Sequence, residues 1–319
     1  MGNVSDSTIG VDIGGTKILA GVVNTDGVIT ATARCDTARQ DAGKVLEQVA
    51  ELVEELRAAS PDPIVGVGAG IAGGVSKDRS FVYFAPNLVW ERVPAGEILS
   101  AACDIPVVIE NDGNAAAWGE VQFGAARGEC DVVMITVGTG IGGGIVINGE
   151  MFRGAHGAAS EIGHITMVPE GRPCGCGRVG CWEQYASGNA LVREARALAG
   201  ERRSEAGHLL GLGDGTPEGV QGAHITAAAV AGDPVAIAAF ESVGTWLGLG
   251  LADLTAVLDP DVFVIGGGVS DAGELLLASA RATLAEQLVG GDTRPTPRIV
   301  LAQLGNSAGL NGAADLARH

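Results

Sequence analysis

Four residues near the middle of the sequence have types and spacing that could bind a metal ion. They are His164, Cys174, Cys176 and Cys181. One imidazole and three thiolates form the closed set of four nitrogen and sulfur ligands that a structural zinc ion prefers. The alternative is unpaired small residues scattered in a core, but three cysteines so close together among glycines are atypical of a core. We therefore predict a structural zinc site with no coordination position left for water.

Two carboxylates accompany this cluster. Glu161 lies three residues before the histidine, and Glu183 lies two residues after the last cysteine. A loop braced by a metal would hold both rigidly, as hydrogen-bond acceptors for a ligand with several hydroxyl groups. We predict that Glu161 and Glu183 bind such a ligand.

Glycine-rich turns are the second kind of candidate. In such turns backbone N–H groups can approach phosphate oxygens, and a carboxylate at the end of the preceding strand can hold Mg²⁺, here through water. A plain hairpin turn is the alternative for each turn taken alone. The second turn matches the dinucleotide-binding glycine pattern, but a strand follows it where that fold requires a helix. The candidates are Asp12, Gly14, Gly15, Thr16 and Lys17 in the first turn, and Gly138, Thr139 and Gly140 in the second.

A third glycine turn, Gly266, Gly267 and Gly268, follows a buried strand at 262–265. It is either an ordinary link to a helix capped by Ser270 or Asp271, or a floor for adenosine.

The polar segment that ends the predicted strand 105–110 is the catalytic candidate. Asp112 could cap the helix expected at 114–121, or act as a general base that takes a proton from a substrate hydroxyl. Asn111 would orient that hydroxyl. Asn87 suits hydrogen bonding to a polyol, although a turn is its alternative interpretation.

The elements that must position these residues repeat along the chain. Residues such as Ile13 and Val137, Gly14 and Gly138, or Asn24 and Asn148 correspond at an offset of 124, so each half opens with a strand, a glycine turn and a second strand. We expect a mobile surface loop without chemistry at 204–222 and a last helix from about Ala308. The other predicted elements are strands at 8–13, 17–24, 27–34 and 64–71, and helices at 42–59, 188–199, 234–258 and 271–289.

Composition and charge argue against several classes of protein. The formal charge of −18 argues against a nucleic-acid surface, which would need a basic stripe, so we expect no nucleic-acid partner. No secretory signal or membrane span is visible, and six cysteines with a C-x-C spacing suit a reducing compartment with metal. We expect a cytoplasmic protein that does not contact a membrane.

Together these motifs resemble the ROK family of repressors and sugar kinases, and within it the bacterial ATP-dependent glucokinases. The resemblance covers nearly the whole chain, and the metal motif is its most specific part. It implies an α/β, duplicated ribonuclease H-like (actin/hexokinase-type) ATPase fold with two domains around a cleft. It implies Asp112 as base, and Asn87, Asn111, Glu161, His164 and Glu183 as sugar ligands, with one ring nitrogen of the histidine on zinc and the other on the sugar. ATP with Mg²⁺ and glucose are the expected ligands, and a dimer or tetramer the expected assembly.

The domains expected on this basis are 1–110, completed by 307–319, and 111–306, which carries the zinc site. Three alternatives stay open. The chain could act on another hexose, such as N-acetylmannosamine, mannose or fructose, or use polyphosphate in place of ATP. A sugar-responsive repressor is disfavoured, because its extra DNA-binding domain would precede a first strand that starts near Thr8, and because the chain is acidic.

Overall fold

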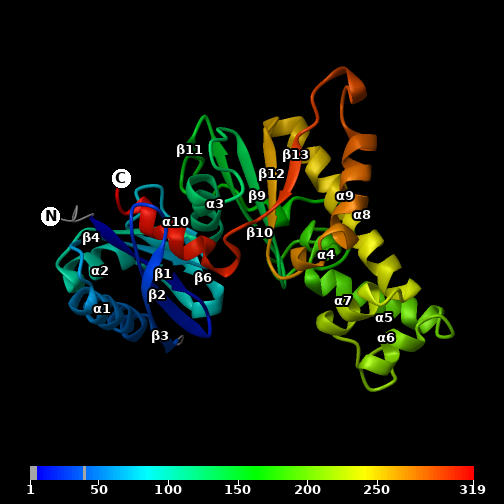
Figure 1. Cartoon of the computed structure of the whole chain (residues 1–319), viewed down its shortest axis with the longest axis horizontal. Coiled ribbons are helices and arrows are strands. Elements are labelled where there is room, and N and C mark those ends of the chain that lie inside the picture. The colour runs from blue at the N-terminus through cyan, green and yellow to red at the C-terminus, as the bar shows by residue number, and fades with distance from the viewer. Residues whose placement is uncertain (1–5, 39–40) are drawn as a thin grey trace. The chain divides into compact units, whose positions relative to one another are not determined.

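The computed structural model describes residues 6–38 and 41–319 of the chain. It divides into two compact units, each described separately (Figure 1). Unit 1 comprises Met1–Met134, Gly143–Ser160 and Ala302–His319, and unit 2 comprises Ile135–Gly142 and Glu161–Leu301. Unit 1 includes residues 111–134, 143–160 and 302–306, which are predicted from the sequence to lie in the second domain. The boundaries of functional domains stay a prediction.

Two five-stranded sheets share one order of strands. The first is ordered β3-β2-β1-β4-β8 and the second β11-β10-β9-β12-β13. The repeat at an offset of 124 residues therefore reflects a duplicated topology. The first sheet consists of β1 (Ser7–Ile13), β2 (Lys17–Val23), β3 (Ile29–Asp36), β4 (Ile64–Ile71) and β8 (Val107–Asn111). The second consists of β9 (Val132–Val137), β10 (Ile141–Ile147), β11 (Glu150–Met151), β12 (Val262–Gly266) and β13 (Arg298–Leu301).

Strand direction in the first sheet brings candidate residues to one edge. The neighbours β1, β4 and β8 are parallel, and their register aligns Ile13, Ile71 and Asn111 in one row. The carboxyl ends of parallel strands are where open α/β sheets bind ligands. Asp12 and Asp112, one residue before and after this row, therefore belong to the same edge of the sheet.

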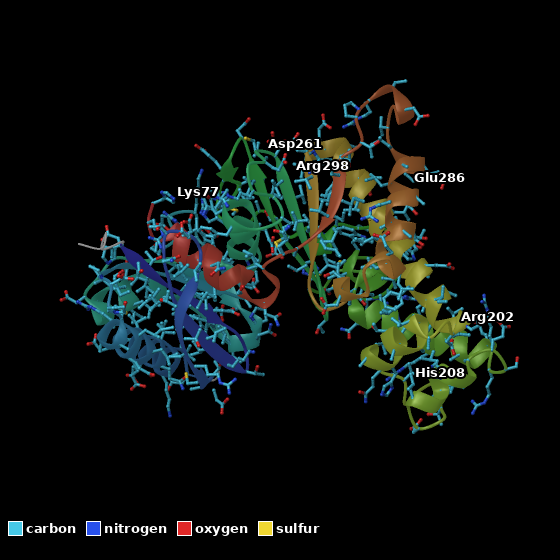
Figure 2. All side chains as sticks on the ribbon, viewed as in Figure 1. Lys77, Arg202, His208, Asp261, Glu286 and Arg298 are labelled. Carbon is cyan, nitrogen blue, oxygen red and sulfur yellow. The ribbon has the colours of Figure 1, made fainter. Side chains whose placement is uncertain are left out.

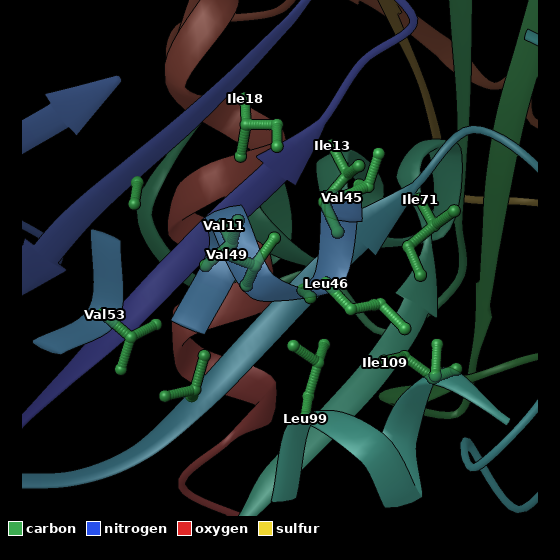
Figure 3. Packing of buried hydrophobic residues seen from close by; sticks show 14 of the residues in the cluster. Val11, Ile13, Ile18, Val45, Leu46, Val49, Val53, Ile71, Leu99 and Ile109 are labelled. Carbon is green, nitrogen blue, oxygen red and sulfur yellow. The ribbon is translucent and has the colours of Figure 1, made fainter. Parts of the chain in front are cut away.

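The core of unit 1 lies between this sheet and two helices, α1 (Ala42–Ala59) and α2 (Ala95–Cys103) (Figure 3). Helix α1 has the bounds that the sequence predicts, because apolar residues recur at helical spacing and Asp41 caps its first turn. Its glutamates at positions 47, 51, 54 and 55 are exposed, as expected for a solvated face. A small sheet of β5 (Gly74–Val75), β6 (Val82–Ala85) and β7 (Trp90–Val93) completes the N-terminal half.

The opposite face of the first sheet is covered by the end of the chain. Helix α10 (Ala308–Leu316), red in Figure 1, lies on the blue strand β1 and on β4. A Cβ added to Gly10 would lie 2.0 Å from the carbonyl oxygen of Leu310, and one added to Gly68 would lie 1.7 Å from that of Ala313. Glycine at both positions thus lets helix and sheet backbones touch. Helix α3 (Asp112–Phe123) packs on α10 in the same unit.

Unit 2 is mainly helical around its strands. Its helices are α4 (Glu183–Ala186), α5 (Gly188–Glu201), α6 (Gly207–Leu212), α7 (Gly222–Val230), α8 (Pro234–Leu258) and α9 (Glu274–Gln287). Helix α8 has its predicted bounds, with Asp233 as cap and Pro234 at the first position. Among the described residues α8 is the one helix long and apolar enough to cross a membrane, and 56% of its most apolar window is buried in the protein.

Two predictions for this unit are wrong. The stretch 204–222 contains helix α6 and the start of α7, where a mobile loop is expected from its many polar residues and glycines. Leu209 and Leu210 anchor α6, and His208, labelled in Figure 2, projects from the same helix. Neither Ser270 nor Asp271 caps the following helix: α9 begins after Gly273, and the Ser270 hydroxyl donates to Gly267 O at 2.7 Å.

Candidate functional site

The four predicted metal ligands come together in unit 2. Their donor atoms, one from each of His164, Cys174, Cys176 and Cys181, all lie within 4.8 Å of one another. Cys174 Sγ is 3.7 Å from His164 Nδ1, and Cys176 Sγ is 3.6 Å from Cys181 Sγ. Tetrahedral zinc with bonds of about 2.3 Å to sulfur separates its ligands by about 3.8 Å. The arrangement therefore fits a zinc ion held through Nδ1 of the histidine.

Two glycines make this local fold possible. Gly163, between the glutamate and histidine of the motif, would place a Cβ 2.3 Å from the carbonyl oxygen of Ile141. Gly180 has a φ of 73°, and a Cβ there would lie 1.8 Å from Val168 O. At both positions of the metal motif the backbone passes so close to another backbone carbonyl that only glycine fits.

The thiol groups differ in acidity. Burial, reinforced by the adjacent thiols of Cys176 and Cys174, raises the pKa of Cys181 to about 12. Burial also opposes ionisation of Cys176, but hydrogen bonds from the Arg178 backbone and from the two other cysteines outweigh it and lower its pKa. Because a metal binds thiolates, uptake of the ion must displace the proton from Cys181, and metal affinity will fall as pH falls.

The segment after the cysteines is held by helix α8. Trp182 is fully buried, and its indole nitrogen donates to the carbonyl oxygen of Trp246 at 2.7 Å. The ring lies on Gly250, where a Cβ would approach it to 2.1 Å. The metal segment, residues 161–183, is therefore packed onto the long core helix α8 through Trp182.

The two flanking carboxylates differ in their surroundings. Glu161 is exposed, and its Oε2 lies 4.0 Å from Nε2 of His164, the ring nitrogen on the far side from Cys174. Glu183 accepts a hydrogen bond from the backbone N–H of Ile141 at 3.1 Å and lies 3.6 Å from Cys174 Sγ. Its carboxylate thus touches both the metal segment and the second glycine turn.

The second and third glycine turns also lie together in unit 2. Val269 N donates to the carbonyl oxygen of Val137 at 3.0 Å, and a Cβ on Gly267 would lie 2.6 Å from that oxygen. Gly188 N, in the first turn of α5, donates to Gly138 O at 2.8 Å. This brings Gly138, Thr139 and Gly140 next to Gly266, Gly267 and Gly268. The sequence gives no signal for the participation of Gly188, which only the fold brings to this place.

The first glycine turn lies in unit 1, beside a candidate sugar ligand. Gly14 N donates to Lys17 O at 3.1 Å, which closes a hairpin between β1 and β2. A Cβ on Gly15 would lie 3.1 Å from Cβ and O of Asn87, which is exposed on a short 3₁₀ helix, Pro86–Leu88. Burial raises the pKa of Asp12, and the charge of Lys17 partly offsets this.

The residue that caps α3 is Asn111, not Asp112. The Asn111 side-chain oxygen accepts from Asn114 N at 3.0 Å, and its amide nitrogen donates to Gly73 O at 3.1 Å. Asp112 occupies the first turn of the helix, is exposed and accepts from Gly113 N at 2.9 Å. Because another residue caps the helix, the capping interpretation of Asp112 is wrong.

Comparison with known proteins agrees with these motifs and this topology. Residues 8–319 match the ROK family, to which this chain belongs. The chain is 51% identical over 311 residues to the glucokinase of Streptomyces coelicolor, covering 98% of this chain and 97% of that protein. It aligns with a ROK family glucokinase from Streptomyces griseus, solved in complex with glucose and AMPPNP, with a TM-score of 0.85 and 49% identity over 98% and 99% of the two chains.

Xylose repressors are also relatives of this chain. The xylose repressor of Caldicellulosiruptor bescii is 34% identical over 247 residues, which cover 76% of this chain and 60% of the repressor.

Proposed function

We propose that this protein is a glucokinase that transfers the γ-phosphoryl group of ATP to a hydroxyl of glucose and forms glucose 6-phosphate. The observation that carries this proposal is the near full-length similarity to a glucokinase solved with glucose and an ATP analogue. The described geometry supports it through the metal cluster, the paired glycine turns and the exposed carboxylate of Asp112.

In this proposal Asp112 is the general base. Its carboxylate accepts the proton of the glucose hydroxyl as the oxygen attacks phosphorus, which raises the nucleophilicity of that oxygen. The positive end of the α3 dipole stabilises negative charge in the first turn, where Asp112 lies. Asn111 retains one N–H and one lone pair for substrate beside its two internal hydrogen bonds.

The other substrate contacts follow from the same chemistry. Asn87 in unit 1, and Glu161, His164 Nε2 and Glu183 in unit 2, are the proposed sugar ligands. Zinc would be held by the three cysteines and His164 Nδ1, where it fixes the orientation of the ring. The Asp12–Lys17 turn and the paired turns of unit 2 bind phosphate and nucleoside through backbone N–H groups, and Mg²⁺ accompanying ATP neutralises phosphate charge.

Substitution of Asp112 by Asn tests the role of the base. We expect turnover to fall by about 10²- to 10⁴-fold with little change in the KM for glucose, because the loss affects only proton transfer. A coupled assay of ATP consumption measures both constants. A turnover close to that of the parent enzyme would remove Asp112 from this role.

Substrate choice is tested with the same assay on a panel of sugars. Glucose should give the highest kcat/KM, ahead of mannose, fructose and N-acetylmannosamine, and ATP should exceed polyphosphate as donor. A higher value for another hexose would keep the kinase and change its substrate. The xylose repressor relationship makes a gel-shift assay a useful companion, in which the charge of −18 predicts no DNA binding.

Two further properties belong to this proposal. We infer a cytoplasmic enzyme, which the free cysteines and the metal cluster support, since thiols persist in a reducing compartment. We also propose a homodimer or homotetramer on the basis of family resemblance, measurable by light scattering.

A further inference from the structure

A buried carboxylate lies directly before the proposed catalytic motif. Glu110, at the end of β8, is 2% exposed. Its Oε1 accepts from the backbone N–H of Asn111 at 3.1 Å and from the side-chain amide of Asn114 at 2.9 Å. These two residues flank Asp112 in the first turn of α3. One carboxylate oxygen therefore holds the backbone of Asn111 before the proposed base and the side chain of Asn114 after it.

The other oxygen of Glu110 binds an arginine 43 positions away. Arg153 donates to Glu110 Oε2 from Nε and from Nη2, both at 2.7 Å, and its side chain is 19% exposed. Burial lowers the pKa of Arg79, and the nearby charge of Arg153 adds to this lowering. Arg153 O accepts from Ala159 N at 3.3 Å, within the segment that leads to Glu161. The ion pair thus joins the first turn of α3 to the chain that runs toward the metal motif.

A pair of this kind is a weak source of stability. Desolvation of two charges offsets most of their attraction, so well-packed apolar residues often serve a fold equally well. Its short, two-point geometry instead restricts where the joined segments can lie. The pair adds little stability, has a restrictive geometry and lies beside the motif Asn111–Asn114. A role in positioning that motif therefore explains it better than a role in stability.

We infer that Glu110 and Arg153 are positioning residues for phosphoryl transfer, which set the first turn of α3 and thereby the placement of the Asp112 carboxylate. This inference rests on the proposed role of Asp112 as base. Neither side chain is assigned a contact with substrate. Their effect is on the geometry of attack, so it should appear in kcat and leave the binding of glucose nearly unchanged.

The test compares single and paired substitutions. Arg153→Met leaves the buried carboxylate without its counter-ion, and Arg153→Lys retains charge but loses the two-point contact. We expect both to lower kcat per folded molecule by about 10- to 100-fold, the size of effect that a displacement of about 1 Å produces. The KM for glucose should stay within about threefold, and zinc content should not change.

The double variant Glu110→Gln with Arg153→Met separates positioning from stability. Removing both charges should raise Tm relative to Arg153→Met, because no buried charge is left unpaired. Turnover should nevertheless stay at least about tenfold below that of the parent enzyme, because the link between the segments is still missing. Arg281→Met is the matched control, since it removes an exposed arginine–glutamate pair, with Glu274, and should leave kcat unchanged.

Two results would overturn the inference. One is recovery of turnover together with Tm in the double variant, which would indicate a structural role only. The other is parental kcat in both Arg153 variants. Asp112→Asn, measured in parallel, distinguishes the causes: a fast Asp112→Asn enzyme contradicts the proposed base itself, whereas a slow one beside fast Arg153 variants contradicts only the positioning role.

Discussion

Cys176 is exposed, whereas two of the other three proposed zinc ligands, Cys174 and Cys181, are buried. Replacement of Cys176 by Ala should release zinc and raise the KM for glucose, because the metal no longer holds the segment that carries Glu161 and His164 in place. Metal analysis of the purified variant and steady-state kinetics measure these effects. Cys130→Ala is the control, since that exposed cysteine lies outside the cluster. A parent protein without zinc would contradict the prediction.

Asp12 should lower stability while serving function. Burial raises its pKa in the folded protein, so the unfolded chain ionises first as pH rises. The folded state therefore loses stability as pH rises through the folded pKa, and Asp12→Asn should raise Tm at pH 7. The gain should vanish below the unfolded pKa of about 3.9. We also expect a higher KM for MgATP.

Thermal unfolding across pH, with kinetics at pH 7, checks this pair of effects. A lower Tm for Asp12→Asn at pH 7 would mean that the carboxylate makes net favourable contacts, against the sign argued from its burial.

Individual site residues were predictable from the sequence where they lie close together along the chain, and not where tertiary structure alone brings them together. The metal ligands lie within one short segment, so their spacing alone predicts the cluster. The Glu110–Arg153 pair joins positions 43 apart with no spacing signal, and only tertiary structure brings the two together. For the cap of α3 only Asp112 was considered from the sequence, whereas the neighbouring Asn111, an equally suitable residue type, occupies that position.

Among the elements, the contact between α10 and the first sheet depends on glycine. Gly68→Ala would place a methyl group 1.7 Å from Ala313 O, so helix and strand must separate. Overpacking of this kind costs about 1–3 kcal/mol. Chemical denaturation measures the change in the free energy of unfolding.

Gly200→Ala is the matched control, because among the described residues nothing beyond its chain neighbours and its own helix backbone lies within 4 Å of the added Cβ near the end of α5. It should stabilise the protein by about 0.5–1 kcal/mol, as alanine does in a helix. Equal effects of the two substitutions would contradict the argument from close packing.

Helices and strands were predictable where several signals coincide. Periodicity, capping residues and a following proline fix α1 and α8 to their observed bounds. Helix α6 has none of these: it contains Gly207 and Gly211 and has no side-chain cap. Its leucines are held by tertiary packing, which a local pattern does not reveal.

For the whole molecule, net charge controls the approach of ligands. A protein of charge −18 repels MgATP, which is an anion, and salt screens this repulsion. The KM for MgATP should therefore fall as ionic strength rises from low values toward about 0.15 M. The KM for glucose, a neutral molecule, should not change and serves as the internal control.

A KM for MgATP that rises with salt would instead mean that local basic groups, such as Lys17, govern encounter. Kinetics in potassium chloride at constant free Mg²⁺ distinguish the two.

The duplicated topology was predictable at this scale because the two halves repeat their opening at a constant offset. The final helix starts at Ala308, as expected, but its place against the glycines of β1 and β4 follows from packing alone.

That placement affects how the protein is made. The surface of β1 and β4 that receives α10 is synthesised long before the residues that cover it. On the ribosome the nascent first sheet thus waits, with its glycine-lined face bare, until residues 308–316 have been translated. A transcript cut short before codon 308 would yield a polypeptide in which α10 does not cover the first sheet.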